Sequence, residues 1–466
     1  MERLAFSLGT PRSAPAASTA RPAAASSPMA RAEAADDDGI AFKALLAFTF
    51  VLFLRPQDLL PFLRPLHLAD VTATIALITL IWGRMARGAP ITRYTPELVF
   101  VAALGGVMLA TAPFSVWPGG AVAVFLELYS KVILVFALIV NTVTTRARFE
   151  RLITVIVLGT SYIGVRAVID YARGVNLVEG SRVTGAVGGL FGNPNDMALN
   201  MVAFLPLAIV LALRKNRPLV RLLACIGVPA LAMAIVFSQS RGGTIGMLAM
   251  LVVLLYQMRR IRPGIAALVV AAAFAALPLL PSTFTERMSS IFDAQEDPTG
   301  SREARKRLLR EGLAAFVANP IVGLGAGQFK NYLPEEREEA WRETHNAVLQ
   351  VASELGVVGL ILFLAVVVRG FMAGARASKA LRRARRQHQA RAPGRVRGER
   401  DALELYTAAM VASLTGWFAA AMFASVAYYW TFYLVLGLAV TLREITLAEI
   451  GTTPMAGRTA CRAEAA

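Results

Sequence analysis

Membrane-length apolar runs recur along this chain from residue 40 almost to its end, and no other feature constrains the fold as strongly. Within about 30 Å of hydrocarbon a backbone must satisfy its own hydrogen bonds, which only helices and closed barrels do. Hydrophobic residues make up 56% of the chain and the mean hydropathy is +0.56, which is more apolar than an ordinary globular protein. We therefore predict an all-α polytopic membrane protein with about twelve transmembrane helices.

The apolar runs also predict the organisation of the chain. The twelve helices are expected near residues 40–54, 68–83, 97–113, 121–143, 149–171, 197–213, 219–237, 240–257, 264–281, 347–368, 403–424 and 426–442. Residues 1–39 are rich in Ala, Pro, Ser and Arg, which predicts a disordered cytoplasmic tail. Helices one to nine then occupy 40–281, and 282–346 form one long outward loop. Helices ten to twelve occupy 347–442 around a basic cytoplasmic loop at 369–401, before a cytoplasmic tail at 443–466.

The formal net charge of +17 raises the possibility of nucleic-acid binding, which the placement of the charges makes unnecessary. If the N-terminus is cytoplasmic, basic residues fall into every second loop, as the positive-inside rule requires. Both termini are then cytoplasmic. The residues concerned include Arg84, Arg87, Arg93, Arg146, Arg148, Arg151, Arg214, Lys215, Arg217, Arg221, Arg259, Arg260, Arg262 and the run from Arg369 to Arg400.

Three arginines and a histidine fall on the outer side, where surplus positive charge is not expected: Arg182, Arg241, Arg302 and His345. A guanidinium half-buried at the membrane boundary, as Arg241 is expected to be, pairs with a carboxylate or binds an anion. Forked guanidinium groups can match diphosphate oxygens bidentately and stabilise a diphosphate leaving group. This set predicts transfer from a lipid-linked diphosphate with arginines in place of a divalent cation. The outward acidic cluster Asp293, Glu296 and Asp297 is the alternative that would hold a metal.

His345 directly precedes an apolar run that reaches Val368. At the N-terminal end of a helix the dipole disfavours imidazolium, so a neutral ring can take a proton from an attacking hydroxyl. The alternative is that His345 caps the helix or anchors it at the interface. A cavity near it could also be lined by Asn193, Asn195, Asn346 and Glu354, whereas capping of the sixth helix suffices to explain Asp196.

The long outward loop has its own predicted structure. The stretch SREARKRLLREGLAAFVANP predicts an amphipathic helix with Leu309, Leu313, Phe316 and Val317 on one face. The following Gly323, Gly325 and Gly327 predict a tight turn, because they follow a helix and lack the lysine of a phosphate loop. Earlier in the chain, Glu127 and Lys131 are spaced to neutralise each other within the fourth helix.

Four segments resemble the O-antigen ligase and O-antigen polymerase superfamily of bacterial envelope enzymes. They are SRVTGAVGGLFGNPNDMAL, SQSRGGTIGML, SREARKRLL followed by NPIVGLGAGQF, and THNAVLQVASELGVVGL. The resemblance spans roughly residues 180 to 365. It implies a GT-C-like architecture with a periplasmic loop, in the bacterial inner membrane. It further implies a metal-independent inverting glycosyltransferase that uses no cofactor and takes an undecaprenyl-diphosphate-linked glycan as donor. Carried across by motif, Arg182 and Arg241 hold the diphosphate, Arg302 is a further loop contact, and His345 assists the acceptor hydroxyl.

The acceptor stays open at this point. A ligase transfers the glycan to lipid A core, a polymerase transfers it to another lipid-linked repeat unit, and related enzymes transfer it to protein hydroxyls; we favour the ligase. A transporter of polysaccharide or lipid-linked glycan is the competing class, because twelve helices are common in transporters. Transporters more often show two related halves, which this sequence does not.

Overall fold

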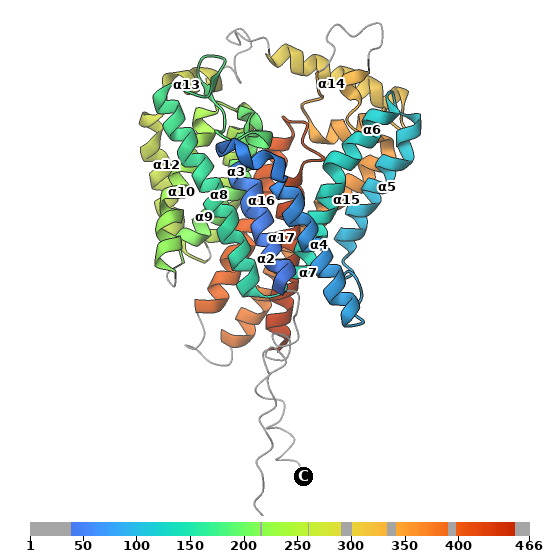
Figure 1. Ribbon diagram of the computed structural model, residues 1–466. Helices are drawn as coiled ribbons and strands as arrows, with labels where there is room; N and C mark the ends of the chain where they lie inside the picture. The colour runs from blue at the N-terminus through green and yellow to red at the C-terminus, as the bar shows by residue number, and fades with distance from the viewer. Residues whose placement is uncertain are drawn as a thin grey trace, which may run out of the picture. The chain divides into compact units, whose positions relative to one another are not determined.

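A computed structural model describes residues 39–214, 217–259, 261–289, 301–332, 342–389 and 398–452 as a helical bundle (Figure 1). The helices are α2 (Gly39–Leu54), α3 (Pro56–Leu59), α4 (Leu68–Ala86), α5 (Pro96–Thr111), α6 (Pro118–Val124), α7 (Ser130–Thr142), α8 (Arg146–Arg173), α9 (Pro194–Ala212), α10 (Pro218–Phe237), α11 (Arg241–Met258), α12 (Pro263–Ala276), α13 (Ser282–Ser289), α14 (Ser301–Ala318), α15 (Ala347–Gln389), α16 (Gly398–Ala421) and α17 (Trp430–Thr452). The predicted all-α polytopic fold is confirmed. The predicted tail at 1–39 lies almost entirely outside the described residues.

Each of the twelve predicted apolar runs coincides with a helix, and ten helical segments of the described chain are long and apolar enough to cross a membrane. The other two predicted spans are α12 and α16. With 14 residues, α12 reaches only about 21 Å at 1.5 Å per residue, short of the hydrocarbon thickness. The structure therefore supports a multi-pass membrane protein with ten clear spans.

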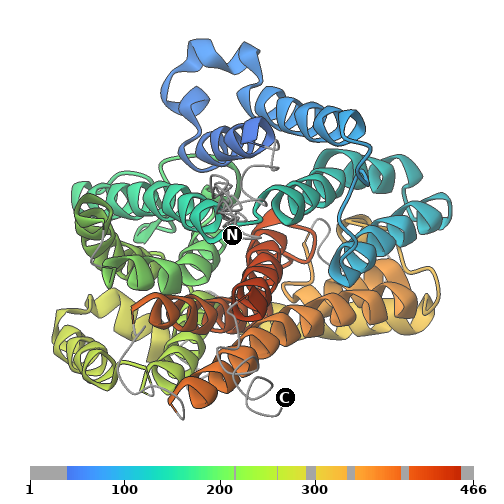
Figure 2. The same cartoon turned by 90° about the horizontal axis from the view of Figure 1, so that it is seen from below.

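The bundle is organised around α9 and α17, whose apolar windows are each 83% buried inside the protein. Figure 2 shows α17, in dark red, in the middle of the bundle. The corresponding window of the segment Pro61–Ala86 is only 17% buried, so its apolar side chains face outward. An apolar helix that is buried on all sides forms a core, whereas one exposed on most sides faces lipid.

Helix α15 differs from the prediction. A basic loop was expected at 369–401, but the helix continues to Gln389, and α17 likewise runs ten residues past the expected end at 442, to Thr452. Within α15, Gly356 has φ 65° and ψ −164°, which kinks the helix. A Cβ at Gly356 would lie 2.3 Å from the Ile321 carbonyl oxygen, so only glycine lets the two chains approach this closely.

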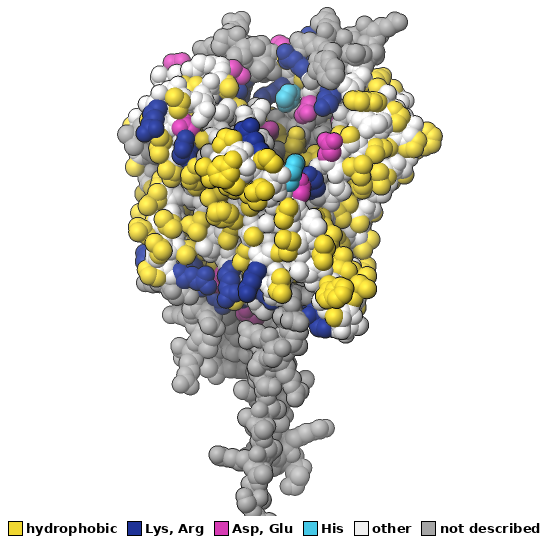
Figure 3. Space-filling view, viewed as in Figure 1, with side chains coloured by type: hydrophobic (Ala, Val, Ile, Leu, Met, Phe, Trp, Pro, Cys, Tyr) yellow, Lys and Arg dark blue, Asp and Glu magenta, His cyan; other side chains and the backbone are white. Residues whose placement is uncertain are grey.

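Charged and hydrophobic side chains lie in separate bands on the surface of the bundle. Figure 3 shows a belt of hydrophobic side chains with a row of Lys and Arg below it. The expected Glu127–Lys131 pair is wrong: the Lys131 Nζ instead lies 3.3 Å from the Asp70 Oδ1. Glu127 lies inside a π-helical turn at Phe125–Tyr129, where the rotation per residue differs from that of the α-helix on which the prediction depended.

Candidate functional site

Arg182 is presented by a two-stranded hairpin between α8 and α9. Strand β1 (Leu177–Val178) pairs antiparallel with β2 (Arg182–Val183), with Val178 opposite Arg182. The turn residues Glu179 and Gly180 both have positive φ, as a type I′ hairpin turn requires. Glycine adopts this conformation freely but glutamate does not, so the backbone conformation of Glu179 is energetically unfavourable.

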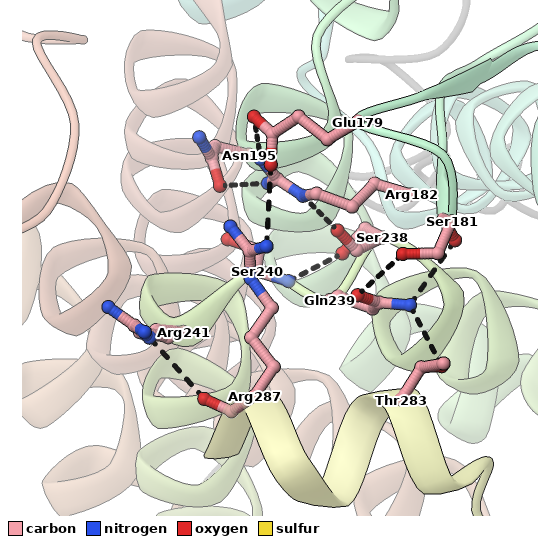
Figure 4. Close-up of polar contacts among 10 residues, drawn as sticks. All are labelled: Glu179, Ser181, Arg182, Asn195, Ser238, Gln239, Ser240, Arg241, Thr283 and Arg287. Carbon is pink, nitrogen blue, oxygen red and sulfur yellow. Dashed lines mark hydrogen bonds and ion pairs between the residues drawn. The ribbon is translucent and has the colours of Figure 1, made fainter. Parts of the chain in front are cut away.

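The Arg182 side chain is buried and holds three protein groups (Figure 4). Its Nε donates to the Ser238 carbonyl at 3.0 Å, its Nη1 to the Glu179 carboxylate at 3.2 Å, and its Nη2 to the Asn195 side-chain oxygen at 2.8 Å. Burial, together with the charges of Arg287 and Arg305, lowers the pKa of Arg182. The guanidinium therefore connects the hairpin to the N-terminal end of α9 and to Ser238, the C-cap residue of α10.

Glu179 bridges two guanidinium groups. Its Oε1 accepts from Arg182 and its Oε2 accepts from the Arg287 Nη1 at 3.3 Å. The carboxylate itself is half-exposed, with 54% of its side chain accessible, although Arg182 is buried. An exposed carboxylate between two arginines marks a position where an anion is bound by both.

Arg241 begins α11 beside the same cluster. The buried Arg241 Nε donates to the Arg287 carbonyl at 3.4 Å, so α13 lies against the start of α11. Ser240 caps α11 by accepting from the Gly243 amide, and Gln239 donates to Ser181 and to Thr283 of α13. Figure 4 shows the Arg182, Arg241 and Arg287 side chains around this junction. The positive end of α11 adds to the attraction for an anion here.

A cavity of about 70 Å³ adjoins the arginines and has polar walls. Three distant segments form it: the start of α9, the residues before α15, and the connection between α16 and α17. It is lined by Asn193, Asn195, Asp196, Glu343, His345, Phe423, Ala424, Ser425 and Tyr429. Asn195 belongs to both the cavity and the arginine cluster, since it accepts from Arg182. Arg182 and Arg241 themselves are not among the lining residues.

His345 is held in place through its backbone. Its amide donates to the Ser425 Oγ at 2.9 Å, and its φ of 49° lies in the left-handed region. Asn346, rather than His345, caps α15: the Asn346 Oδ1 accepts from the amides of Val348 and Leu349, each at 3.0 Å. The imidazole is thus not used as the cap, and no described residue hydrogen-bonds to it. Burial and the charges of Arg305 and Arg342 lower the pKa of His345, which favours the neutral ring.

Two carboxylates face the cavity that sequence reasoning did not assign to it. Asn193 caps α9, because its side-chain oxygen accepts from the Asn195 amide at 2.8 Å. The expected capping role of Asp196 is therefore not needed, and no described residue hydrogen-bonds to its carboxylate. Although Glu343 is exposed by area, its carboxylate stands among the packed atoms of the cavity wall, and this desolvation raises the pKa of Glu343. The two acids, His345 and Tyr429 form the titratable lining.

Asn346 and Glu354, which were predicted to line the cavity, are not among its lining residues. Arg302 is in the first turn of α14, but its side chain is outside the described residues. Arg305, one turn further along, is the loop arginine whose charge acts on both Arg182 and His345. Glu354 accepts from the Gly327 amide at 2.7 Å and from the Phe329 amide, so it fixes the glycine-rich turn against α15. The predicted tight turn is thus tied to the helix that follows His345.

Backbone strain is concentrated at this site. Six non-glycine residues of the described chain have positive φ, and three of them are Glu179, Gln239 and His345. Such residues persist where the surrounding structure enforces them, and they cluster at functional sites. Among the described residues no group of three or more His, Cys, Asp and Glu is arranged to hold a metal. The expected acidic cluster at Asp293, Glu296 and Asp297 lies outside them.

The comparison with known families agrees with the resemblance read from the sequence. Residues 226–364 match the family model described as O-antigen ligase. This part of the chain is similar to that family. It contains Arg241, Arg287 and His345, whereas Arg182 and Asp196 precede it. No curated protein matches the sequence.

Sequence reasoning could have found the missing residues by its own rules. Arg287 is an outward arginine in the predicted loop, and the argument applied to Arg182 applies equally to it. Glu343 is two positions before His345 in the same segment. Asp196 carried a weaker signal, because an acid in the first turn of a helix is normally explained by the dipole.

Proposed function

We propose that this chain is a glycosyltransferase of the O-antigen ligase type, acting from the periplasmic face of the bacterial inner membrane. It transfers a glycan from undecaprenyl diphosphate to an acceptor hydroxyl with inversion. The observation that carries the proposal is one small cavity, lined by His345, Asp196 and Glu343, that shares Asn195 with a cluster of buried arginines. The O-antigen ligase family match supports the same class of reaction.

The arginine cluster is the donor side of the proposed site. Glu179 already occupies a position between the guanidinium groups of Arg182 and Arg287. A diphosphate carries more charge than one carboxylate and would displace this exposed side chain. Arg241 and the positive end of α11 add to the binding. As the glycosidic bond to the phosphate breaks, these groups stabilise the charge that develops on the leaving diphosphate.

The cavity is the acceptor side. The acceptor oxygen attacks the anomeric carbon, the bond from that carbon to the phosphate oxygen breaks, and the hydroxyl proton passes to the neutral His345. Asp196 and Glu343 accept hydrogen bonds from neighbouring hydroxyl groups of the acceptor. Two acids here disfavour an anionic group in the cavity, so the portion of the acceptor that enters it is a neutral sugar or another uncharged hydroxyl compound.

The decisive experiment reconstitutes the purified protein in liposomes with a polyprenyl-diphosphate glycan. Lipid A core, a lipid-linked repeat unit and a hydroxyl-bearing peptide are offered separately as acceptors. We expect one of them to become glycosylated with release of polyprenyl diphosphate, in the presence or absence of a chelator. Movement of the glycan across the bilayer without formation of a new glycosidic bond would instead identify a transporter.

A further inference from the structure

Helix α14 presents an apolar stripe that the bundle leaves uncovered. Leu309, Leu313 and Val317 recur every four residues and are 52%, 55% and 69% exposed, and Ile321 beyond the helix end is 70% exposed. Positions four apart lie on one side of a helix. These are residues of the face predicted from the sequence, which the structure turns away from the protein.

A different face of α14 packs inward. Leu308 and Ala315 are buried against Leu324 and Phe329, and Gly312 lies so close to α15 that a Cβ there would be 2.6 Å from Leu349. At 100° per residue, Leu308, Gly312 and Ala315 lie roughly a third of a turn or more from Leu313. The packing of α14 on α15 therefore does not account for the stripe.

The end of α14 is tied to a part of the bundle with the marks of a membrane interface. The Val116 amide donates to the Leu324 carbonyl at 3.0 Å, which joins the segment after α14 to the connection between α5 and α6. That connection exposes Phe114 and Trp117, and tryptophan is enriched at the level of lipid headgroups. Figure 1 shows α14 at the same end of the bundle as α6. Ile321 and the last turn of α14 are thus at the level of this aromatic pair.

Basic residues complete the pattern. The N-terminal half of α14 carries Lys306 and Arg310, both exposed, which lie on one side of Leu309, about 60° and 100° round the helix from it. Long basic side chains beside an apolar stripe can reach lipid phosphates while their stems cover apolar surface. A helix with an apolar side and a basic flank is the type that lies in the plane of an interface.

We propose that α14 lies in the plane of the outer leaflet, with Leu309, Leu313, Val317 and Ile321 immersed in lipid. The occupant of the stripe is the bilayer itself. One consequence is that Arg305, on the same helix, is held at a fixed depth beside the cavity. The proposal does not depend on the transferase function, because its test measures depth and not catalysis.

The test uses the full chain with Cys225 and Cys461 replaced by alanine. Single Leu313→Cys and Ala314→Cys variants are labelled with an environment-sensitive fluorophore in liposomes of phosphatidylethanolamine and phosphatidylglycerol. Position 314 is exposed and only one residue away, but about 100° round the helix. We expect a blue-shifted emission quenched by spin-labelled lipid at position 313, and quenching by aqueous iodide at position 314.

Two results would overturn this placement. Iodide quenching at 313 equal to that at 314 would put the stripe in water. A blue shift at 313 without quenching by spin-labelled lipid, combined with disulfide cross-linking between two 313 positions, would make a second copy of the chain the occupant. Neither result depends on whether glycan is transferred.

Discussion

Two carboxylates at opposite ends of the bundle, Glu97 and Asp196, differ in how the protein pairs them. At the basic end, Glu97 is buried and accepts from the Arg443 Nη1 at 2.8 Å, the Arg443 Nη2 at 3.2 Å and the Arg369 Nε at 3.1 Å. This ion-pair cluster joins α5, α15 and α17. At the other end, the side chains of Asp196 and His345 line a cavity and form no hydrogen bond with the described residues.

The difference separates structural charges from functional ones. A buried charge that is fully paired holds helices together, and its removal leaves its partner uncompensated. A partly buried charge without a protein partner costs stability, and it is retained where a ligand or a reaction uses it. By this criterion the Glu97 cluster is structural, and Asp196 in the cavity is a candidate functional group of the proposed site.

The largest expected effect is on transfer. His345→Ala and Arg241→Ala should reach the membrane in normal amount and lose about 10²-fold or more of glycan transfer, because each removes a group acting on the reacting atoms. Transfer is measured in vesicles, normalised to the amount of protein. His67→Ala and Arg173→Ala, which remove exposed residues of the same types, are the matched controls. Full transfer by either site variant would refute the assigned chemistry.

A second prediction removes one carboxylate at each end. Glu97→Ala should destabilise the protein by about 3–5 kcal/mol, because it removes the carboxylate that pairs both terminal nitrogens of the buried Arg443 and leaves that guanidinium only its Nε contact with Glu444. Asp196→Ala should leave thermal stability in detergent unchanged or raised, since it relieves repulsion with Glu343. It should lower transfer by about tenfold, the value of a lost hydrogen bond of roughly 1.4 kcal/mol.

Glu97→Ala should lower stability, whereas Asp196→Ala should lower transfer without lowering stability. If Asp196→Ala lowered the stability of the protein as much as Glu97→Ala does, Asp196 would be a structural residue. The double variant Glu97→Leu with Arg443→Met, which removes both partners, should recover most of the stability lost in Glu97→Ala.

The smallest expected effect concerns pH. Burial and the charges of Arg305 and Arg342 lower the pKa of His345, so the neutral ring persists as the pH falls and transfer is lost only when the ring is protonated. Arg305→Gln removes one of these charges and raises the pKa of His345. The acid limb of the pH profile should therefore move to higher pH. Lys306→Gln, an exposed neighbour whose charge does not act on His345, is the control; an identical profile for both variants would contradict the role of Arg305.

The amino-acid sequence by itself determined the class of fold and one side of the chemistry. Apolar runs long enough to cross a membrane must form helices to satisfy their backbone hydrogen bonds. The alternation of basic loops distinguishes the two ends of the helical bundle. Arg182, Arg241 and His345 could be singled out because each is a charged or titratable side chain on the side where surplus positive charge is not expected. These are local signals, readable from single segments.

Only the tertiary structure decided which side chains share the site. Asp196 and Glu343 are separated by more than 140 positions and face one cavity because α9 and α15 pack beside the connection between α16 and α17. Capping of the sixth helix sufficed to explain Asp196 from the sequence, whereas in the structure Asn193 caps α9 and the Asp196 side chain lines the cavity. Likewise, periodicity identified the apolar face of α14 but not the direction it faces. Periodicity fixes where side chains lie around one helix, whereas the neighbours of that helix are set by packing across the whole chain.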